Sequence, residues 1–470
     1  MIKWLRAFRL TKKEFIILIT MLSILKCILL YWVGEVLVTP HRMIGYLPDS
    51  RMYETIARNI ISGHGFSSDM QEPFRPTMFK EPVYALFIAL IYLIFGYFTN
   101  YIILFQMLLN PLIAILIYFI GIELFDERIA RWASLLVCFT PVFGEISFFI
   151  QTEGFYLPLM LLFLYTMIKA FAKNRLPYYV FSGILLGICS LCRNIIVYSY
   201  ALIIILIAAG YGQGLRFNIS EGFKRRFTKA LFFTASFLLV VLPWIVRNIK
   251  EFKSYQITNK GGESAWVQAT MAENFSTEEF KAYFLYTISG HLAQKKFPHI
   301  IGSDFGDFEY RFQRDTPSDG LRAKGLKEGE IDLILAKEAA RKIFRHPLKF
   351  IIFSTIKYLQ IFKYFVPWSI LFFDGNNKVL SGLVFPAVRF ITGLPLGIFF
   401  SLITILGIYF SRERLVKYLP ILVFIGYYHF ILYFVAALPG GLQRFILPVV
   451  PLYYFFVSIC IFRGCGYRLH

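Results

Sequence analysis

Long apolar runs separated by short polar segments make up most of the chain. The runs extend over roughly 17 to 26 residues, the length that an α-helix needs to cross the hydrocarbon core of a membrane. Their residues do not alternate between apolar and polar as the strands of a membrane β-barrel do. The pattern therefore predicts an all-α polytopic membrane protein. Full spans are expected at residues 15–38, 101–123, 130–149, 153–169, 178–192, 195–212, 230–247, 385–410, 418–437 and 445–462.

Lysines and arginines in the connecting segments predict how the spans are oriented, because basic residues concentrate in cytoplasmic loops. Basic clusters occur at 3–13, 128–131, 169–175, 216–229 and 412–417. These segments are consistent with one another if all of them lie in the cytoplasm. The polar loop at 39–82 and the polar segment at 248–347 then lie on the outer side of the membrane.

Two further apolar runs, 82–98 and 349–372, do not fit as full crossings. In each case one neighbouring span already joins the outer loop to the next basic cluster, so a second crossing would put that cluster on the wrong side. We expect the 82–98 run to be re-entrant or to lie along the outer face. Lys349, Lys357 and Lys363 recur at about two helical turns in the other run, which favours an amphipathic helix at the membrane interface.

The predicted organisation has ten full crossings and both termini in the cytoplasm. If both ambiguous runs cross, the number is twelve and the middle loops invert. We divide the chain into an N-terminal transmembrane module that carries the first outer loop (1–247), an outer polar segment with the interfacial helix (248–384) and C-terminal transmembrane helices (385–470). We expect no internal repeat and no soluble domain with a core of its own.

The composition narrows the functional class. The chain of 470 residues is 57% hydrophobic and has a mean hydropathy of +0.60, which is too apolar for a soluble fold of this size. A net charge of +20 would suit a nucleic-acid-binding protein. Here, however, the bases cluster at helix ends, where they set orientation and meet anionic headgroups. The expected partner is therefore the lipid bilayer and not a nucleic acid. The six cysteines lie in apolar runs or at the C-terminal tail, which argues against a disulfide framework.

Charged residues gather at the outer face in this topology. They are Asp49, Arg75, Lys80 and Glu81 in the first outer loop, Glu153 and Arg193 at later turns, Arg247 at the end of a span and Arg444 at the start of one. Because the positive-inside rule disfavours arginine on the outer side, this cluster needs a reason. A bound phosphate is the simplest, since arginine offers a planar fork for phosphate oxygens and lysine a point charge.

Two carboxylates at this face are candidates for catalysis. Asp49 precedes a helix-like pattern at 50–61, so it is either a helix N-cap or a general base that deprotonates an acceptor hydroxyl. Glu153 either orients the acceptor, binds the sugar or is a charge favoured by the helix dipole. Glu81 could simply form an ion pair with its neighbour Lys80.

The arginines have a plain alternative as well. Arg193 and Arg247 each follow or end an apolar span, so they could snorkel to lipid headgroups. Arg444 enters a span directly, and a charge near the membrane interior is costly and tends to be functional. The seven histidines form no metal-ligand pattern, although His41 and His64 share the first loop with Asp49. We expect no required cofactor, with a divalent metal as the alternative.

The ordered set of motifs resembles the GT-C superfamily of integral-membrane glycosyltransferases. The resemblance is strongest to the branch that contains the protein O-mannosyltransferases and the lipid A aminoarabinose transferase. The set consists of Asp49-Ser-Arg-Met-Tyr53, Gly63-His-Gly65, Arg75-Pro76, Lys80-Glu81-Pro82, Thr152-Glu153, Arg193, Pro243-Trp244 with Arg247-Asn248, and Arg444-Phe445 with Pro448. Each motif alone is weak, but the series runs through almost the whole chain.

The resemblance implies a polyprenyl-phosphate-linked sugar as donor, inversion at the anomeric carbon and a site on the outer face of the bacterial cytoplasmic membrane. It implies that Asp49 is the catalytic residue and that Glu153 corresponds approximately to a second acidic residue. Tyr53, Arg75 and Glu81 would complete the first-loop part of the site. The branch often has Glu-Lys-Pro where this chain has Lys80-Glu81-Pro82.

The expected function is transfer of a hexosyl or pentosyl group to a lipid, glycan or protein acceptor. Asp49 would act as the base, and Lys80, Arg193, Arg247 and Arg444 would neutralise the departing phosphate. One alternative is a lipid-linked sugar flippase or transporter, which would need charged or broken helices near the bilayer centre. Another is a polysaccharide ligase or polymerase with the same donor chemistry.

Overall fold

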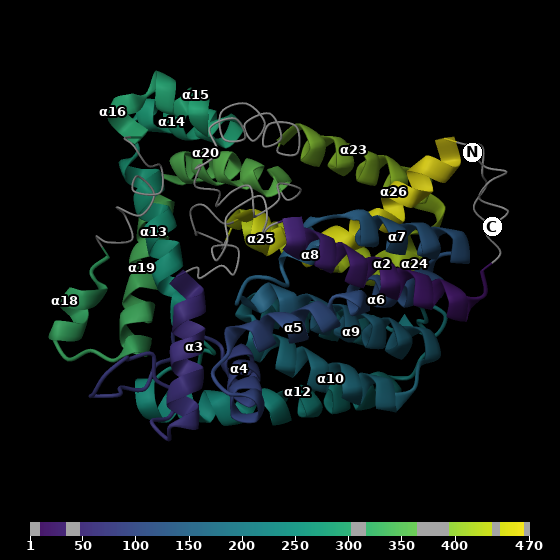
Figure 1. The fold of residues 1–470 in the computed structure, drawn as a ribbon, viewed down its shortest axis with the longest axis horizontal. Helices are drawn as coiled ribbons and strands as arrows, with labels where there is room; N and C mark the ends of the chain where they lie inside the picture. The colour runs from purple at the N-terminus through teal and green to yellow at the C-terminus, as the bar shows by residue number, and fades with distance from the viewer. Residues whose placement is uncertain (1–9, 34–47, 302–315, 364–393, 435–441, 465–470) are drawn as a thin grey trace.

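The computed structural model describes residues 10–33, 48–301, 316–363, 394–434 and 442–464. Almost all of the described elements are helices. The two strands, β1 (Tyr211–Gly212) and β2 (Arg216–Phe217), form one short antiparallel pair. Figure 1 shows a bundle of helices running along the longest axis and a layer of other helices at its left end. The all-α fold class predicted from the hydrophobic pattern is confirmed.

The bundle accounts for the apolar runs. It consists of α2 (Lys12–Val33), α5 (Thr99–Leu109), α6 (Pro111–Leu124), α7 (Glu127–Phe139), α9 (Thr152–Lys173), α10 (Leu176–Cys192), α11 (Ser199–Ala208), α12 (Phe223–Phe252), α23 (Leu394–Phe410), α24 (Leu415–Phe434) and α26 (Val450–Gly464). Within the described residues, five segments are long and apolar enough to cross a membrane: Lys12–Trp32, Thr99–Leu124, Thr152–Lys173, Phe223–Phe252 and Arg412–Phe434. Shorter apolar helices pack beside them.

Close helix packing fixes the bundle where α10 crosses α12. A Cβ atom added at Gly183 would lie 2.4 Å from the carbonyl oxygen of Phe233, and one at Gly187 would lie 2.7 Å from Val240. Larger side chains would therefore push the two helices apart, as in other membrane helix pairs joined by small residues. The contact holds the C-terminal half of α10, which ends at Cys192 before Arg193, in a fixed place.

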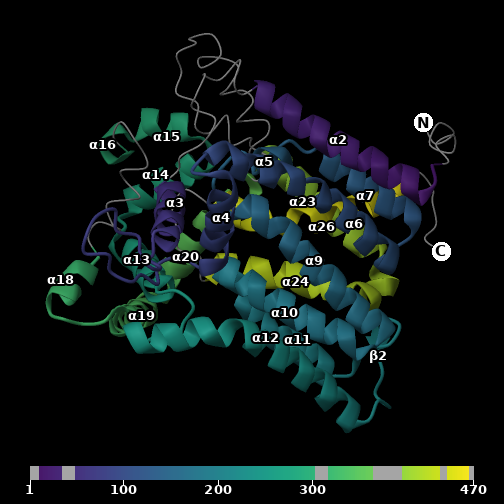
Figure 2. The ribbon, with the colours of Figure 1, turned by 60° about the horizontal axis from the view of Figure 1, so that its bottom comes forward.

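The basic end of the bundle is closed by buried polar contacts. Lys229 of α12 donates to Glu221 at 2.5 Å, and Asn174, the left-handed residue that ends α9, donates to the same carboxylate at 3.2 Å. Lys169 also bonds Glu123 there. Figure 2 shows β2 at this end and α3 (Pro48–Ile61) at the opposite end.

The predicted span 130–149 is a regular helix only in its first half. α7 ends at Phe139, and Thr140 is extended because the following Pro141 disfavours the helical conformation in the residue before it. The short helix α8 (Val142–Glu145) and a series of turns then lead to Gln151. The prediction of one continuous span was wrong here.

Two amide side chains bind backbone carbonyls of α8 and of the irregular segment that follows it. Gln106 donates to the carbonyls of Ser147 and Phe149 at 3.0 Å each, and Asn110 donates to the carbonyl of Phe143. Irregular backbone at membrane depth requires such protein partners, since lipid offers none. The contacts place the start of α9 against α5 and α6.

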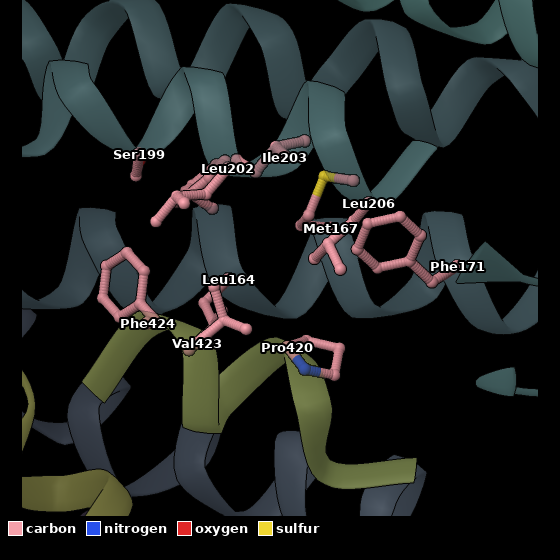
Figure 3. Close-up of a pocket in the computed structure, with 11 residues that line it drawn as sticks. Leu164, Met167, Phe171, Ser199, Leu202, Ile203, Leu206, Pro420, Val423 and Phe424 are labelled. Atoms are coloured by element: carbon pink, nitrogen blue, oxygen red, sulfur yellow. The ribbon is translucent and has the colours of Figure 1, made fainter. Parts of the chain in front are cut away.

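An apolar cleft lies between α9, α11 and α24 (Figure 3). Its cavity volume is only about 20 Å³, and Leu164, Met167, Leu202 and Phe424 are among its lining residues. Its one hydroxyl group belongs to Ser199, which donates to the carbonyl of Ile196 in its own turn. The lining therefore offers contacts mainly to an apolar chain.

Helices outside the bundle form the layer at its left end in Figure 1. They are α3, α4 (Pro82–Phe95), α13 (Lys260–Asn274), α14 (Thr277–Ile288), α15 (Gly290–Lys296), α16 (Pro298–Ile301), α18 (Ser318–Ala323), α19 (Glu328–Arg345), α20 (Pro347–Tyr358), η3 (Leu359–Lys363) and α25 (Leu442–Ile446). The segment η2 (Asn194–Tyr198) joins α10 to α11. α4 packs beside α3 at the end of the bundle, and the expectation that the 82–98 run does not cross fully stays a prediction.

The predicted absence of a separate core in the segment after residue 248 was wrong, because this segment has a hydrophobic core of its own. Apolar side chains of α13, α14, α19 and α20 form a cluster separate from that of the bundle, and it includes Trp266, Met271, Phe275, Tyr283, Ile331, Leu335 and Phe353. Their spacing is masked in the sequence by the many charges on the exposed faces. The helices that carry these side chains are short and amphipathic, so no long apolar run marks them.

The interfacial-helix prediction for 349–372 is wrong in one respect. Lys349 is exposed, but Lys357 is fully buried, so the lysines do not share one wet face of the helix. Burial lowers the pKa of Lys357 to about 7. Helical structure reaches Lys363 in η3, and the remaining residues of this run lie outside the described part.

Candidate active site

Asp49 lies in the first turn of α3 and binds two cations. Its Oδ1 accepts from Lys80 Nζ at 2.5 Å, and its Oδ2 accepts from Arg444 Nη2 at 3.0 Å. The Lys80 side chain is only 3% exposed and lies 5.0 Å from the centre of the Tyr53 ring. The partners of Asp49 thus come from the first loop and from the last part of the chain.

Glu153, in the first turn of α9, forms the second centre of the network. It accepts from Arg193 Nη1 at 2.6 Å, and the side chains are 4% and 9% exposed, respectively. Arg193 also donates to Thr152 at 3.3 Å and stacks its guanidinium over Phe445 at 4.5 Å. Arg193 is therefore held on several sides.

Arg444 joins the two carboxylates. It lies in the five-residue helix α25, which is separated from α26 by the turn at 447–449, where Pro448 interrupts the predicted span 445–462. Its Nη1 donates to Gln151 Oε1 at 3.2 Å, and its Nε lies 3.9 Å from Glu153 Oε1, beyond hydrogen-bonding distance. Gln151 immediately precedes α9 and ends the irregular segment described above. The path of that segment therefore sets the position of the amide that binds Arg444.

Glu81 does not serve chiefly as the partner of its neighbour Lys80. Its carboxylate accepts the backbone N–H of Asn194 at 3.2 Å, whereas Lys80 donates to Asp49. The sequence alternative of a simple exposed Lys80–Glu81 pair is thus wrong, because both side chains are buried and bind other segments. Glu81 also precedes α4, so it ties α4 to the turn after α10.

The ring of Tyr53 lies against the Lys80 side chain. Its ring meets that of Tyr84 edge to face with centroids 5.0 Å apart, and Tyr84 donates to Gln106 at 2.9 Å. Burial, with smaller effects from the carboxylates of Glu81 and Asp49, raises the pKa of Tyr53 well above its ordinary value. The phenol therefore stays neutral across the physiological range.

Two predicted site residues belong to other contacts. Arg247 donates to the carbonyls of Thr77 at 2.9 Å and Phe66 at 3.5 Å. These hydrogen bonds attach the polar loop before α4 to α12. The Arg75 side chain is 77% exposed and pairs with Asp69. Hydrogen bonding from the Arg75 backbone lowers the pKa of Asp69. The structure does not bring either arginine into the Asp49–Glu153 network, and phosphate binding by Arg247 stays a prediction.

The part of the chain that the structure describes contains no cluster of side chains suited to the alternative of a bound metal ion. No group of three or more His, Cys, Asp or Glu side chains there is arranged to hold an ion. His64 stacks on Phe74 with ring centroids 3.9 Å apart, and His41 lies outside the described residues. The expectation of no required cofactor stays a prediction.

The sequence did not predict the hydrogen bonds by which Gln106, Asn110 and Gln151 hold other segments in place. Gln106 and Asn110 lie one helical turn apart within an apolar run, which is a signal that could have identified them, since polar residues inside a span usually have a partner or a function. Gln151 gives no such signal, because it stands among other polar residues at a turn.

The ion pairs of the network contain one more cation than carboxylates. Two carboxylates, Asp49 and Glu153, face three cations, Lys80, Arg193 and Arg444, so their net formal charge is −2 + 3 = +1. The buried carboxylate of Glu81 lies beside them at Asn194. The cluster lies where the apolar bundle meets the polar layer. An arrangement of this kind can receive an anionic headgroup whose apolar chain remains in the membrane.

The fold and this cluster define a helical membrane protein with a charged site at one end of its bundle. Residues 75–246 match the family described as dolichyl-phosphate-mannose-protein mannosyltransferase. This match confirms, over that segment, the resemblance to integral-membrane glycosyltransferases that the motifs indicated. No curated protein matches the chain.

Solved structures of similar proteins have low sequence identity to the chain. A structure of the Archaeoglobus fulgidus oligosaccharyltransferase tethered with an acceptor peptide is 14% identical, with a TM-score of 0.49, covering 95% of this chain and 49% of that one. AglB from the same organism, with an inhibitory peptide and a dolichol-phosphate, is 12% identical with a TM-score of 0.47 over 98% and 53%. ArnT from Cupriavidus metallidurans bound to undecaprenyl phosphate is 13% identical with a TM-score of 0.39 over 93% and 78%. The chain spans about half the length of the oligosaccharyltransferases.

Proposed function

We propose that the protein transfers a sugar from a polyprenyl-phosphate-linked donor to an acceptor hydroxyl. The observation that carries the proposal is the convergence of Asp49, Lys80, Arg193 and Arg444 at one end of an apolar bundle. The family match over residues 75–246 supports the same class of donor, because the family description names a lipid-phosphate-linked mannose.

The donor phosphate is received by the cations. Arg444 and Arg193 both approach Glu153, at 3.9 and 2.6 Å, so a phosphate beside them meets two guanidinium groups. As the bond between the anomeric carbon and the phosphate oxygen breaks, negative charge grows on that oxygen. Preorganised cations at this point stabilise the developing charge without a large reorganisation. Lys80 adds a third cation through its contact with Asp49.

Asp49 takes the proton of the acceptor. The acceptor oxygen attacks the anomeric carbon, the carbon–oxygen bond to the phosphate breaks with its electron pair staying on the phosphate, and the hydroxyl proton passes to the Asp49 carboxylate. Attack opposite the leaving phosphate inverts the anomeric centre. Glu153 keeps Arg193 in place and orients the reacting groups from the other side of Arg444.

The apolar cleft between α9, α11 and α24 offers an apolar surface along which a segment of the isoprenoid chain can lie (Figure 3). Ser199 marks the end of the cleft next to η2, which follows Arg193 directly. A lipid whose phosphate lies at Arg193 can therefore continue along this cleft. Branched isoprene units would replace lipid contacts with contacts to Leu202, Met167 and Phe424.

The charged site faces the outer side of the bacterial cytoplasmic membrane in this proposal. The lysine-rich and arginine-rich loops meet at the opposite end of the bundle, where Arg131 donates to Leu10 and Tyr211 donates to Val416. Because basic loops stay in the cytoplasm, the Asp49 end lies outside. A flippase would instead need charges near the bilayer centre, and the ion pairs described above lie at the two ends.

The test is transfer by the full-length protein reconstituted in liposomes. Labelled polyprenyl-phosphate sugars are supplied from the outside or the inside, and glycosylated lipid, glycan and protein products are identified by mass spectrometry. NMR of the product gives the anomeric configuration. We expect transfer from one side with inversion. Movement of the intact donor across the bilayer without cleavage would instead establish the transporter class.

A further inference from the structure

The three cations of the site are not held alike. Lys80 and Arg193 are almost completely buried and each forms a short contact to one carboxylate, at 2.5 and 2.6 Å. The Arg444 side chain is 24% exposed, bonds Asp49 at 3.0 Å and reaches Glu153 only at 3.9 Å. Its buried Nε has no hydrogen-bond partner among the described residues. Arg444 is thus the cation with the weakest hold on its place.

Gln151 depends on Arg444 for its only side-chain hydrogen bond within the described residues. An arginine has no acceptor, so the Gln151 atom that meets Arg444 Nη1 at 3.2 Å is the amide oxygen. The amide nitrogen then faces elsewhere, and it is buried without a partner in the described part of the chain. Gln151 is only 2% exposed, so water cannot replace Arg444 freely if it leaves.

Asp49 is engaged on both oxygens in this arrangement. Oδ1 accepts from Lys80 and Oδ2 accepts from Arg444. Each carboxylate oxygen has a second lone pair, and the Asp49 side chain is 33% exposed, so Asp49 keeps acceptor positions while Arg444 is bound. A donor phosphate that attracts Arg444 would make the whole of Oδ2 available to the acceptor hydroxyl. After transfer the phosphate product must depart, and Arg444 must return.

We propose that Gln151 is a positioning residue that draws Arg444 back from the phosphate of the product to Asp49. The inference rests on the proposed function. When Arg444 turns to the phosphate, the buried Gln151 amide is left with neither of its polar ends bonded, which is unfavourable. That cost favours return of Arg444 and release of the polyprenyl phosphate. A neutral amide adds to the hold of Asp49 on Arg444 without placing a further negative charge beside the phosphate.

The test compares Gln151→Leu with wild type in the full-length protein in nanodiscs. Binding of a C55 polyprenyl phosphate and of the uncharged C55 polyprenol is measured, together with kcat. We expect Gln151→Leu to bind the phosphate about tenfold more tightly, equivalent to ~1.4 kcal/mol, with polyprenol binding unchanged and kcat lowered by slow release. Gln151→Glu should shift phosphate binding the opposite way. Gln71→Leu, an exposed glutamine of the first loop, is the matched control.

The direction of the Gln151→Leu effect separates this role from a structural one. Damage to the site would weaken phosphate binding, and the charge of the site is the same in Gln151→Leu and wild type. Unchanged or weaker phosphate binding would overturn the proposal. So would a structure of the wild-type complex with C55 polyprenyl phosphate in which the Arg444–Asp49 contact persists. If wild type binds phosphate and polyprenol equally, the proposed function fails as well.

Discussion

The two ends of the bundle contain ion pairs of equal burial and different organisation. At the site, Arg193 and Glu153 are 9% and 4% exposed, and at the basic end Lys229 and Glu221 have the same exposed fractions. The basic-end pair is a closed unit completed by the amide of Asn174. The site pair belongs to a chain of charges that continues through Arg444 to Asp49 and Lys80.

The comparison teaches that burial of an ion pair does not by itself indicate a function. Glu221 has its pKa lowered, because hydrogen bonds from Lys229 and Asn174 outweigh the opposing effect of burial. Such a pair fastens helices together. The site differs in having more cations than carboxylates and one arginine that is not fully bonded. The excess charge is what an anionic ligand can use.

The sharpest test of the difference is Asp49→Asn at the site. The asparagine keeps the shape of the side chain but cannot accept a proton, so we expect transfer to fall by about 10²–10⁴-fold, the range for loss of a general base. Initial rates with a labelled polyprenyl-phosphate sugar provide the measurement, and an unchanged thermal midpoint shows that the fold persists. Transfer within a few-fold of wild type would exclude Asp49 as the base.

Glu221→Gln at the basic end should have the opposite profile. Removing one partner leaves Lys229 buried without its carboxylate, and breaking such a pair typically costs about 3–5 kcal/mol. We expect a lower thermal midpoint and normal transfer per folded molecule. Stability and activity are measured on the same detergent-solubilised preparation. A variant that keeps its stability but loses transfer would remove the distinction between the two ends.

Leu202→Trp tests the space between the two ends. The larger ring would fill the cleft of Figure 3, so we expect KM for a C55 donor to rise about fivefold, or ~1 kcal/mol, with kcat unchanged. A short-chain donor that does not reach the cleft should be unaffected. Ile205→Trp on the exposed face of α11 is the control. Equal effects on both donors would place the isoprenoid chain elsewhere.

The smallest effect is expected at Asp332, in the layer over the site. Burial raises its pKa, although the N–H of Gly262 donates to it at 2.6 Å. A folded-state pKa above the unfolded value of about 3.9 means that stability is greatest below that value and is lost as pH rises through the raised pKa. Asp332→Asn should therefore reduce the loss of thermal stability between pH 4 and pH 8. An identical pH dependence in both proteins would contradict this.

The fold could be predicted from the sequence where a single helix carries the signal. The lengths of the apolar runs predict helices, because length and composition depend on the membrane and not on neighbouring helices. The direction of the spans, which the positions of the bases indicate, stays a prediction. The prediction of a continuous span at 130–149 failed because Gln106 and Asn110, far away in the sequence, allow an irregular segment to be buried. The core of the outer layer was not predicted for a similar reason, since its apolar faces meet only in three dimensions.

The sequence predicts which residues belong to the site better than it predicts which of them contact one another. Arginines on the outer side of the membrane are unusual enough to mark Arg193 and Arg444, and the structure brings both to Glu153. Arg247 has the same sequence signal, yet it binds backbone carbonyls of the first loop. The local sequence does not distinguish an arginine of the ion-pair network from one that anchors a loop. The difference depends on which segment of the chain packs against the arginine.

The hydrogen bond between Asp49 and Arg444 joins residues 395 positions apart in the chain. At about 5–20 residues per second, synthesis reaches Asp49 roughly 20–80 s before it reaches Arg444. By the end of that interval the growing polypeptide contains Asp49, Lys80 and Glu153 but still lacks Arg444, the cation that links them. A chain released before its last helix is made therefore cannot complete this network.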